Sequence, residues 1–337
     1  MKVILYSTEM EELVLKSEFN TIETRSMFKR GERDYSVDIL RCFSCFMVIL
    51  GHAPYFFDYS NTIEAGSLTW AIVIAMRCFF TSGTTMFVMV SGIFFLSPER
   101  HMSAKKIWSK NVLKLSLAYI VWSLLYALFR MLYTDPKPIS LFALMEETLI
   151  EEDHLWYIPM IIGIYVMVPI LRIITENAKI KHYKYMIGLM IAAFTLNTIY
   201  SINEYGVFPY GGGEINAIIL KTPMNDICQY FWYAIFGYYL YTYRPSPKIR
   251  KLIYVLGVIS FATSFLLNVF LYLKAGNFES GSIIHKFTIT TFGKNTAIFL
   301  FIISFFSDIK LSDRTKKIIS KISASTLFIY LAHWMIL

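Results

Sequence analysis

Long apolar runs recur along almost the whole chain, and they constrain its fold more than any other feature. They occupy residues 39–57, 72–96, 112–132, 155–174, 185–199, 227–243, 252–273, 287–306 and 322–337. Most are near the roughly 20 residues that a helix needs to cross about 30 Å of hydrocarbon. Helices are expected, because an isolated strand would leave its backbone polar groups without partners in lipid. The sequence therefore predicts an all-α integral membrane protein, a polytopic bundle of about 9–10 transmembrane helices.

Composition agrees with a lipid environment. Of the 337 residues, 56% are hydrophobic and only 17% are charged, whereas a soluble domain carries about 25% charged residues. The net charge of +8 is also compatible with nucleic-acid binding. The Lys and Arg residues, however, stand in short clusters between apolar runs, which is the pattern that orients membrane helices. We therefore expect the bilayer, and no nucleic acid, as a partner.

The charges of the loops predict the orientation. Every second loop is basic, and an acidic loop follows the third apolar run. The basic residues are Lys29, Arg30, Arg33, Arg100, Lys105, Lys106, Lys110, Lys179, Lys181, Lys184, Arg244, Lys248, Arg250, Lys251, Arg314, Lys316 and Lys317, and the acidic loop holds Glu146, Glu147, Glu151, Glu152 and Asp153. Because basic loops stay in the cytoplasm, the N-terminus is predicted to be cytoplasmic. Residues 1–36 are then a cytoplasmic extension, which we expect to be disordered, and residues 37–337 form the transmembrane domain.

The first apolar run carries the ionisable residues of greatest interest, Asp38, Arg41 and His52. Such groups are costly in a membrane and by default mark a functional site. Eleven residues make about three helical turns, so Arg41 and His52 lie on nearly one face, about 16 Å apart along the axis. Asp38 is placed to neutralise Arg41 in part. Alternatively, Arg41 is an interfacial residue that extends to the surface, and His52 is a helix-end histidine bonded to a neighbour.

Five segments, in order, resemble the motifs of the membrane acyltransferase 3 family. They are the pair Arg41 and His52, the helix around Ser91 and Gly92, the basic segment at Lys110 and Lys114 with Tyr119 and Trp122, the His154–Trp156 segment, and the Tyr330–His333 segment. The resemblance covers residues 35–337. Two features depart from the family pattern: lysines and Asn111 stand where paired arginines are expected, and the sequence stops four residues after His333.

The resemblance implies a membrane-bound O-acyltransferase in the plasma membrane. Members of this family take an acyl group, here expected to be acetyl, from cytoplasmic acyl-CoA. We expect the acceptor to be a hydroxyl of a cell-surface glycan or a similar molecule, with acyl-CoA as co-substrate and neither a bound cofactor nor a metal. His52 is then the general base. Arg41, Lys106, Lys110 and Lys114 hold the CoA phosphates, although cytoplasmic loops are rich in lysine in any case.

Other polar residues outside this set also carry expectations. His333 and Asp38 are candidates for a second site, and for His333 a hydrogen bond that packs helices is an equal alternative. Ser91 and Gly92 are expected to allow close approach of two helices. Lys294 lies near a predicted outer helix end and is left without a role.

A second hypothesis belongs to another functional class. Membrane modules that resemble this family also occur in membrane-bound serine racemases, where they are thought to import an amino acid. In that case Arg41 and His52 line a transport path. The abrupt end of the sequence fits either a shortened last helix or a further domain after Leu337.

Overall fold

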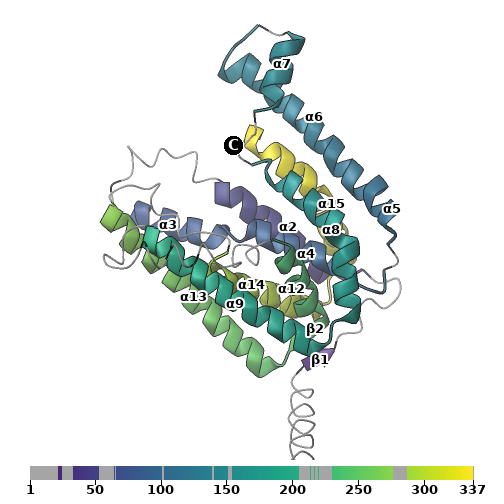
Figure 1. Ribbon diagram of the computed structural model, residues 1–337, viewed down its shortest axis with the longest axis vertical. Helices are drawn as coiled ribbons and strands as arrows, with labels where there is room; N and C mark the ends of the chain where they lie inside the picture. The colour runs from purple at the N-terminus through teal and green to yellow at the C-terminus, as the bar shows by residue number, and fades with distance from the viewer. Residues whose placement is uncertain are drawn as a thin grey trace, which may run out of the picture. The chain divides into compact units, whose positions relative to one another are not determined.

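The apolar runs form helices in the computed structural model of the chain (Figure 1). The structure describes residues 22–24, 33–52, 64, 66–100, 102–138, 140–150, 154–204, 213, 216, 219, 230–275 and 287–336. Two units are distinguished by their internal contacts, one made of Met1–Ile93 and Lys179–Ala324, the other of Phe94–Ala178 and Ser325–Leu337. Each unit is described by itself.

The first unit is a helical bundle organised around α14. Its helices are α2 (Tyr35–His52), α3 (Leu68–Phe80), α4 (Gly83–Phe95, apart from its last two residues), α9 (Ile180–Glu204), α12 (Tyr230–Thr242), α13 (Pro247–Ala275), α14 (Ile289–Ser307) and the first half of α15 (Asp313–Ile336). Helix α14 packs against α2, α9, α12 and α13. Because α14 is surrounded by other helices, most of its side chains are buried, including several polar ones.

Glycine lets α4 and α12 approach closely within this unit. A Cβ atom on Gly92 of α4 would collide with the backbone of Ala234 in α12, and one on Gly237 of α12 would collide with the backbone of Met89 in α4. Small residues play this role at many helix contacts in membranes. The structure confirms the expected close approach at Gly92, and it identifies α12 as the neighbour.

A short antiparallel ribbon completes the first unit. Strand β1 (Ile22–Thr24) pairs with β2 (Tyr243–Pro245), and Glu23 lies opposite Arg244. The prediction of a disordered N-terminal extension is therefore wrong for these three residues. Isolated two-stranded ribbons are marginal on their own, so this one depends on the helices to which its strands are connected.

The second unit contains a long helix and its partners. Its elements are α5 (Ala104–Lys106), η2 (Ile107–Val112), α6 (Leu113–Phe129), η3 (Arg130–Thr134), α7 (Leu141–Thr148), α8 (Tyr157–Asn177) and the last part of α15. The elements η2 and η3 are π-helical and run without interruption into α6. Helix α6 packs against α7 and α8.

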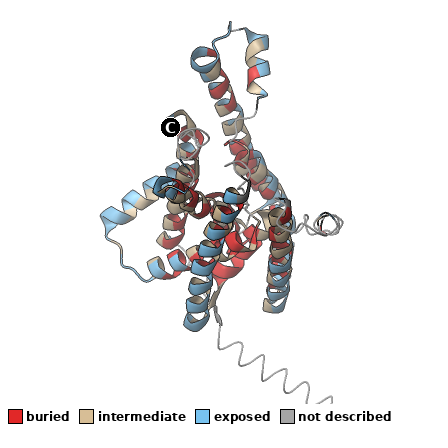
Figure 2. Cartoon of the chain, turned by 90° about the vertical axis from the view of Figure 1, so that its left-hand side faces the viewer, coloured by how far each residue is buried: buried red, intermediate tan, exposed pale blue. Residues whose placement is uncertain are grey.

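Large apolar side chains remain exposed along several helices, as lipid contact requires. Figure 2 shows buried and exposed positions side by side along the helices. The exposed ones include Leu113, Leu117, Ile120 and Val121 of α6, and Leu252, Val255, Val258 and Ile259 of α13. Seven helical segments among the described residues are long and apolar enough to span a membrane. The chain is therefore an all-α, multi-pass membrane protein, apart from the small ribbon.

Several predicted spans differ from the observed helices at their ends. Helix α9 is 25 residues long, because polar turns extend the predicted run 185–199 at both ends. Helix α12 has only 13 residues, and α15 begins with a charged turn, so neither is among the seven. The predicted run 72–96 is broken at Thr81 and Ser82 into α3 and α4. Residues 53–57 of the first predicted run and 151–153 of the acidic loop lie outside the described residues.

Candidate functional site

Helix α2 carries the predicted catalytic and donor-binding pair. It runs without a break from Tyr35 to His52, which confirms that Arg41 and His52 belong to one helix, about 16 Å apart along its axis. Both side chains are half-buried. Asp34 precedes the helix and accepts hydrogen bonds from the Ser36 backbone N–H (3.0 Å) and from the Ser36 hydroxyl (2.6 Å). A carboxylate in this position satisfies a free N–H of the first turn.

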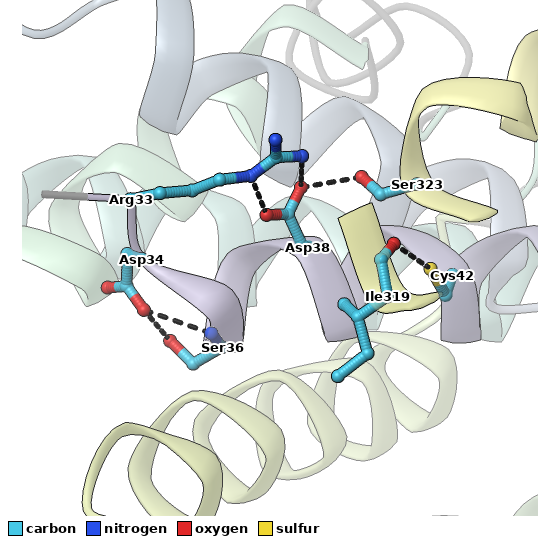
Figure 3. A network of polar contacts seen from close by, with 7 residues as sticks. All are labelled: Arg33, Asp34, Ser36, Asp38, Cys42, Ile319 and Ser323. Carbon is cyan, nitrogen blue, oxygen red and sulfur yellow. Dashed lines mark hydrogen bonds and ion pairs between the residues drawn. The ribbon is translucent and has the colours of Figure 1, made fainter. Parts of the chain in front are cut away.

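The end of α2 that contains Asp38 is fixed by a polar network (Figure 3). The buried Asp38 carboxylate accepts two hydrogen bonds from Arg33, of 2.5 and 3.0 Å, and one of 2.6 Å from the Ser323 hydroxyl of α15. The bond to Asp38 raises the pKa of Arg33 above its ordinary value. Asp38 therefore bonds to Arg33 and Ser323, and its partial neutralisation of Arg41 stays a prediction. A buried carboxylate with three donors is well compensated.

The opposite end of α2 is fixed by backbone packing. A Cβ atom on Gly51, the residue before His52, would lie 3.6 Å from Phe80 Cβ at the end of α3. One turn earlier, Val48 packs against Gly83 at the start of α4, where an added Cβ would lie 2.6 Å from Val48 Cγ2. The segment of α2 that leads to His52 therefore packs on the break between α3 and α4.

The three predicted donor lysines lie in the second unit. Lys106 ends α5, Lys110 lies in η2, and Lys114 lies in the first turn of α6. All three side chains are exposed, and none forms an ion pair with a residue that the structure describes. Short π-helical segments are frequent at functional sites, and η2 lies at the centre of this lysine series.

An open groove of about 590 Å³ runs along the same elements. Its lining consists of Lys105, Trp108, Ser109, Val112, Leu113 and Ser116. The lining residues recur every three or four positions, so they follow one side of α5, η2 and the start of α6. The groove combines a cation, an aromatic ring and apolar surface, which suits a ligand that is anionic at one end and apolar at the other.

His333 lies in a buried cluster of aromatic rings in the second unit. Its ring centroid is 5.3 Å from that of His154, and Trp334 stacks on His154 at the same separation with an interplanar angle of 7°. The Tyr330 hydroxyl donates to the His154 carbonyl. His333 Nδ1 lies 2.5 Å from the Tyr330 carbonyl oxygen of its own helix. These contacts hold the end of α15 to the residues that precede α8.

The structure brings some of the predicted site residues together and leaves others in separate units. Arg41, His52 and Asp38 share α2 in the first unit. The lysine series and His333 belong to the second unit. Arg41 and the lysine series, the residues predicted to bind the donor, therefore belong to different units, and each is described within its own unit. The sequence pattern did not pair Arg33 with Asp38, although the two are five residues apart, and it gave no sign of Ser323, which is 285 residues from Asp38.

The comparisons with known proteins support one family. The sequence model of a family described as an acyltransferase domain, acyltransferase 3, matches residues 34–337. No curated protein and no solved structure matches the chain. The match includes α2 with Arg41 and His52, the lysine series and the cluster around His333. The chain therefore belongs to the membrane acyltransferase 3 family and is an enzyme that transfers acyl groups other than aminoacyl groups.

Proposed function

We propose that the protein transfers an acyl group, specifically acetyl, from cytoplasmic acyl-CoA to a hydroxyl of a cell-surface glycan, and that it does so in the plasma membrane. The observation that carries the proposal is the unbroken helix α2, which holds a cation and a histidine three turns apart. The predicted orientation puts Arg41 near the cytoplasm and His52 toward the outside. An extended pantetheine arm has a length of the same order as the separation between them.

His52 is the general base in this proposal. Its imidazole takes the proton of the acceptor hydroxyl as the oxygen attacks the thioester carbonyl carbon. A C–O bond forms, the C–S bond breaks, and the CoA thiolate leaves and takes up the proton. The products are the acyl ester and CoA with a free thiol. A positioned base of this kind contributes about 10²–10⁴-fold to the rate.

Charged side chains near the predicted cytoplasmic surface bind the donor. Arg41 contributes a guanidinium, which matches the geometry of a phosphate. Lys106, Lys110 and Lys114 contribute ammonium groups that have no ion pair with the described residues, so binding a phosphate breaks no such pair. The adjacent groove beside Trp108 offers apolar surface for the uncharged part of the donor.

Mass analysis of surface glycans tests this function directly. Cells with the gene, without it, and with the His52→Gln variant are compared after feeding with isotope-labelled acetate. We expect labelled acetyl esters on surface glycans only in cells with the unaltered gene. Identical glycan acetylation in all three would contradict the proposal, and esters of a longer acyl chain would correct the donor. Accumulation of a labelled amino acid that depends on the gene, without any ester, would support the transport hypothesis.

A further inference from the structure

The break between α3 and α4 exposes backbone carbonyls inside the first unit. The last carbonyls of a helix lack partners within the helix, and in a membrane no water is available to them. At the end of α3, the Thr81 N–H and its hydroxyl both donate to the Arg77 carbonyl. The Ser82 hydroxyl donates to the Phe79 carbonyl at 3.3 Å. The chain then turns and begins α4 at Gly83.

Lys294 of α14 completes this helix end. Its Nζ donates to the Cys78 carbonyl and, at 3.2 Å, to the Phe79 carbonyl. The side chain is only 3% exposed, so the whole lysine is committed to these contacts. A cation at the C-terminal end of a helix is also favoured by the helix dipole. Lys294 therefore acts as a cap on α3 that comes from another helix.

The next residue of α14 secures the other side of the break. Asn295 Nδ2 donates to the Thr85 hydroxyl in the first turn of α4 at 2.6 Å, and both side chains are fully buried. Two consecutive residues of α14 thus bond to the end of α3 and to the start of α4. Helix α14 fixes the positions of these two helices relative to each other.

The same break supports the His52 end of α2. Gly51 contacts Phe80, one residue after the carbonyls that Lys294 binds, and Val48 contacts Gly83, two residues before Thr85. The Phe80 ring also packs edge-on against Phe46 of α2, with a centroid separation of 6.4 Å. A shift of the break would therefore shift the last turn of α2, which carries His52.

We propose that Lys294 and Asn295 are positioning residues for His52. They hold the break between α3 and α4 in place, and the break in turn holds the last turn of α2 where the imidazole can reach the thioester and the acceptor. The proposal rests on the catalytic role of His52 in the proposed function. It explains why an expensive buried lysine is placed at a helix break.

An engineered cross-link reports the position of α2 without any measurement of activity. A Cβ atom added to Gly51 would lie 3.6 Å from the Cβ of Phe80, within the range of about 3.5–4.5 Å for a disulfide. In a background in which the four native cysteines are alanine, the Gly51→Cys and Phe80→Cys pair should cross-link under mild oxidation in membranes. Adding Lys294→Met, which keeps a similar shape but no donor, should abolish the cross-link, and adding Lys294→Arg should retain it.

Enzyme kinetics supply the second readout, in the chain without engineered cysteines. We expect Lys294→Met to lower kcat by about tenfold to a hundredfold, the scale of a misplacement of about 1 Å, with the KM for acyl-CoA nearly unchanged. Asn295→Leu should give a smaller loss of cross-linking and of kcat, and it serves as the second variant if Lys294→Met does not fold. Thr296→Val is the matched control, since the Thr296 hydroxyl bonds only to Phe292 of its own helix.

The two proposals fail in different ways. Cross-linking that persists in folded Lys294→Met and Asn295→Leu proteins would overturn the positioning role, whatever His52 does. An equal loss in Thr296→Val would also overturn it, because general damage to α14 would then explain the result. Full activity in His52→Gln would overturn the catalytic assignment, while the cross-linking result would still stand as a statement about packing.

Discussion

Lysine occupies opposite environments in α14 of the first unit and along α5, η2 and α6 of the second. Lys294 is buried, and its ammonium is bonded to two backbone carbonyls of the protein. Lys106, Lys110 and Lys114 are exposed and form no ion pair with the described residues. The buried lysine is committed to the fold, whereas the exposed ones are available for a ligand. The contacts that a lysine makes in the folded chain, rather than its position in the hydropathy pattern, therefore indicate its role.

The largest difference between the two regions is expected in stability. Lys294→Met should lower the free energy of unfolding by about 1–3 kcal/mol, the cost of a buried group that loses its partner, because the Cys78 carbonyl loses its lysine donor while the Phe79 carbonyl keeps the Ser82 hydroxyl. Lys110→Met should change it by about 0.5 kcal/mol or less, as exposed substitutions usually do. Thermal unfolding of the two purified variants in the same detergent measures the contrast. Equal stability of the two proteins would show that the buried ammonium contributes nothing net, as can happen when a desolvated charge is replaced by an apolar group.

The affinity for acyl-CoA should depend more on the exposed lysines of the second unit than on Lys294. Removing the charge of Lys106, Lys110 or Lys114 should weaken acyl-CoA binding by about tenfold to a hundredfold where a charged hydrogen bond worth about 1.5–3 kcal/mol is lost. Arg41→Ala is expected to have the largest effect in this group. Equilibrium binding of labelled acetyl-CoA measures it, with Lys317→Ala of α15 as an exposed-lysine control. Unchanged binding in all four variants, with the proteins folded, would remove the donor-site assignment.

A third lysine environment, at η3 and α7, gives the smallest effect. Lys137 donates to Glu147 at 2.7 Å, and Arg130 Nε lies 3.3 Å from the same carboxylate. The hydrogen bond from Lys137 is the main cause that lowers the pKa of the Glu147 carboxyl. A carboxylate whose pKa is lower in the folded protein than in the unfolded chain stabilises the fold at pH values above the pKa of the unfolded chain, ordinarily about 4.3. This stabilisation is lost as the pH falls through the pKa of the folded protein.

Hydrogen exchange of α7 tests this third environment. On acidification below about pH 4.3, the α7 amides should lose protection in the unaltered protein, relative to a Glu147→Gln variant that lacks the titrating group. The effect should be slight and weaker in high salt, because Lys137 is half-exposed and water screens the pair. Identical pH profiles for the two proteins would show that the ion pair does not stabilise α7.

The sequence predicted most helices but not the break in one of them. Hydropathy averages over a window, so the apolar residues of α3 and α4 merged into one run, 72–96. The local signal was the short polar segment Thr81, Ser82 and Gly83. The polar ends of α9 were missed for the same reason, since a helix continues beyond the hydrocarbon wherever its polar turns meet water or other helices. The pairing of β1 with β2 joins residues more than 200 positions apart in the chain, and no local pattern indicates it.

The candidate site was predicted to a similar extent. A helical period suffices to place Arg41 and His52 on one face, and the structure confirms that one helix carries both. Ser323 could not be foreseen as a partner of Asp38, because it is 285 residues away in sequence. Lys294 was noticed as an unexplained charge, but only the folded chain shows that it caps α3. Roles that depend on local periodicity were accessible from the sequence, and roles that depend on which helices meet were not.

The turnover rate of His52→Gln measures whether His52 acts as the general base. Glutamine keeps hydrogen-bonding capacity at a similar size but cannot accept and release a proton, so it separates catalysis from packing. In purified protein with labelled acetyl-CoA and glycan acceptor, acyl transfer should fall by about a hundredfold or more, with folding and acyl-CoA binding retained. In the unaltered protein the rate should fall on acidification, because a protonated imidazole cannot act as a base. A folded His52→Gln protein that transfers acyl groups at the rate of the unaltered enzyme would show that His52 is not the general base.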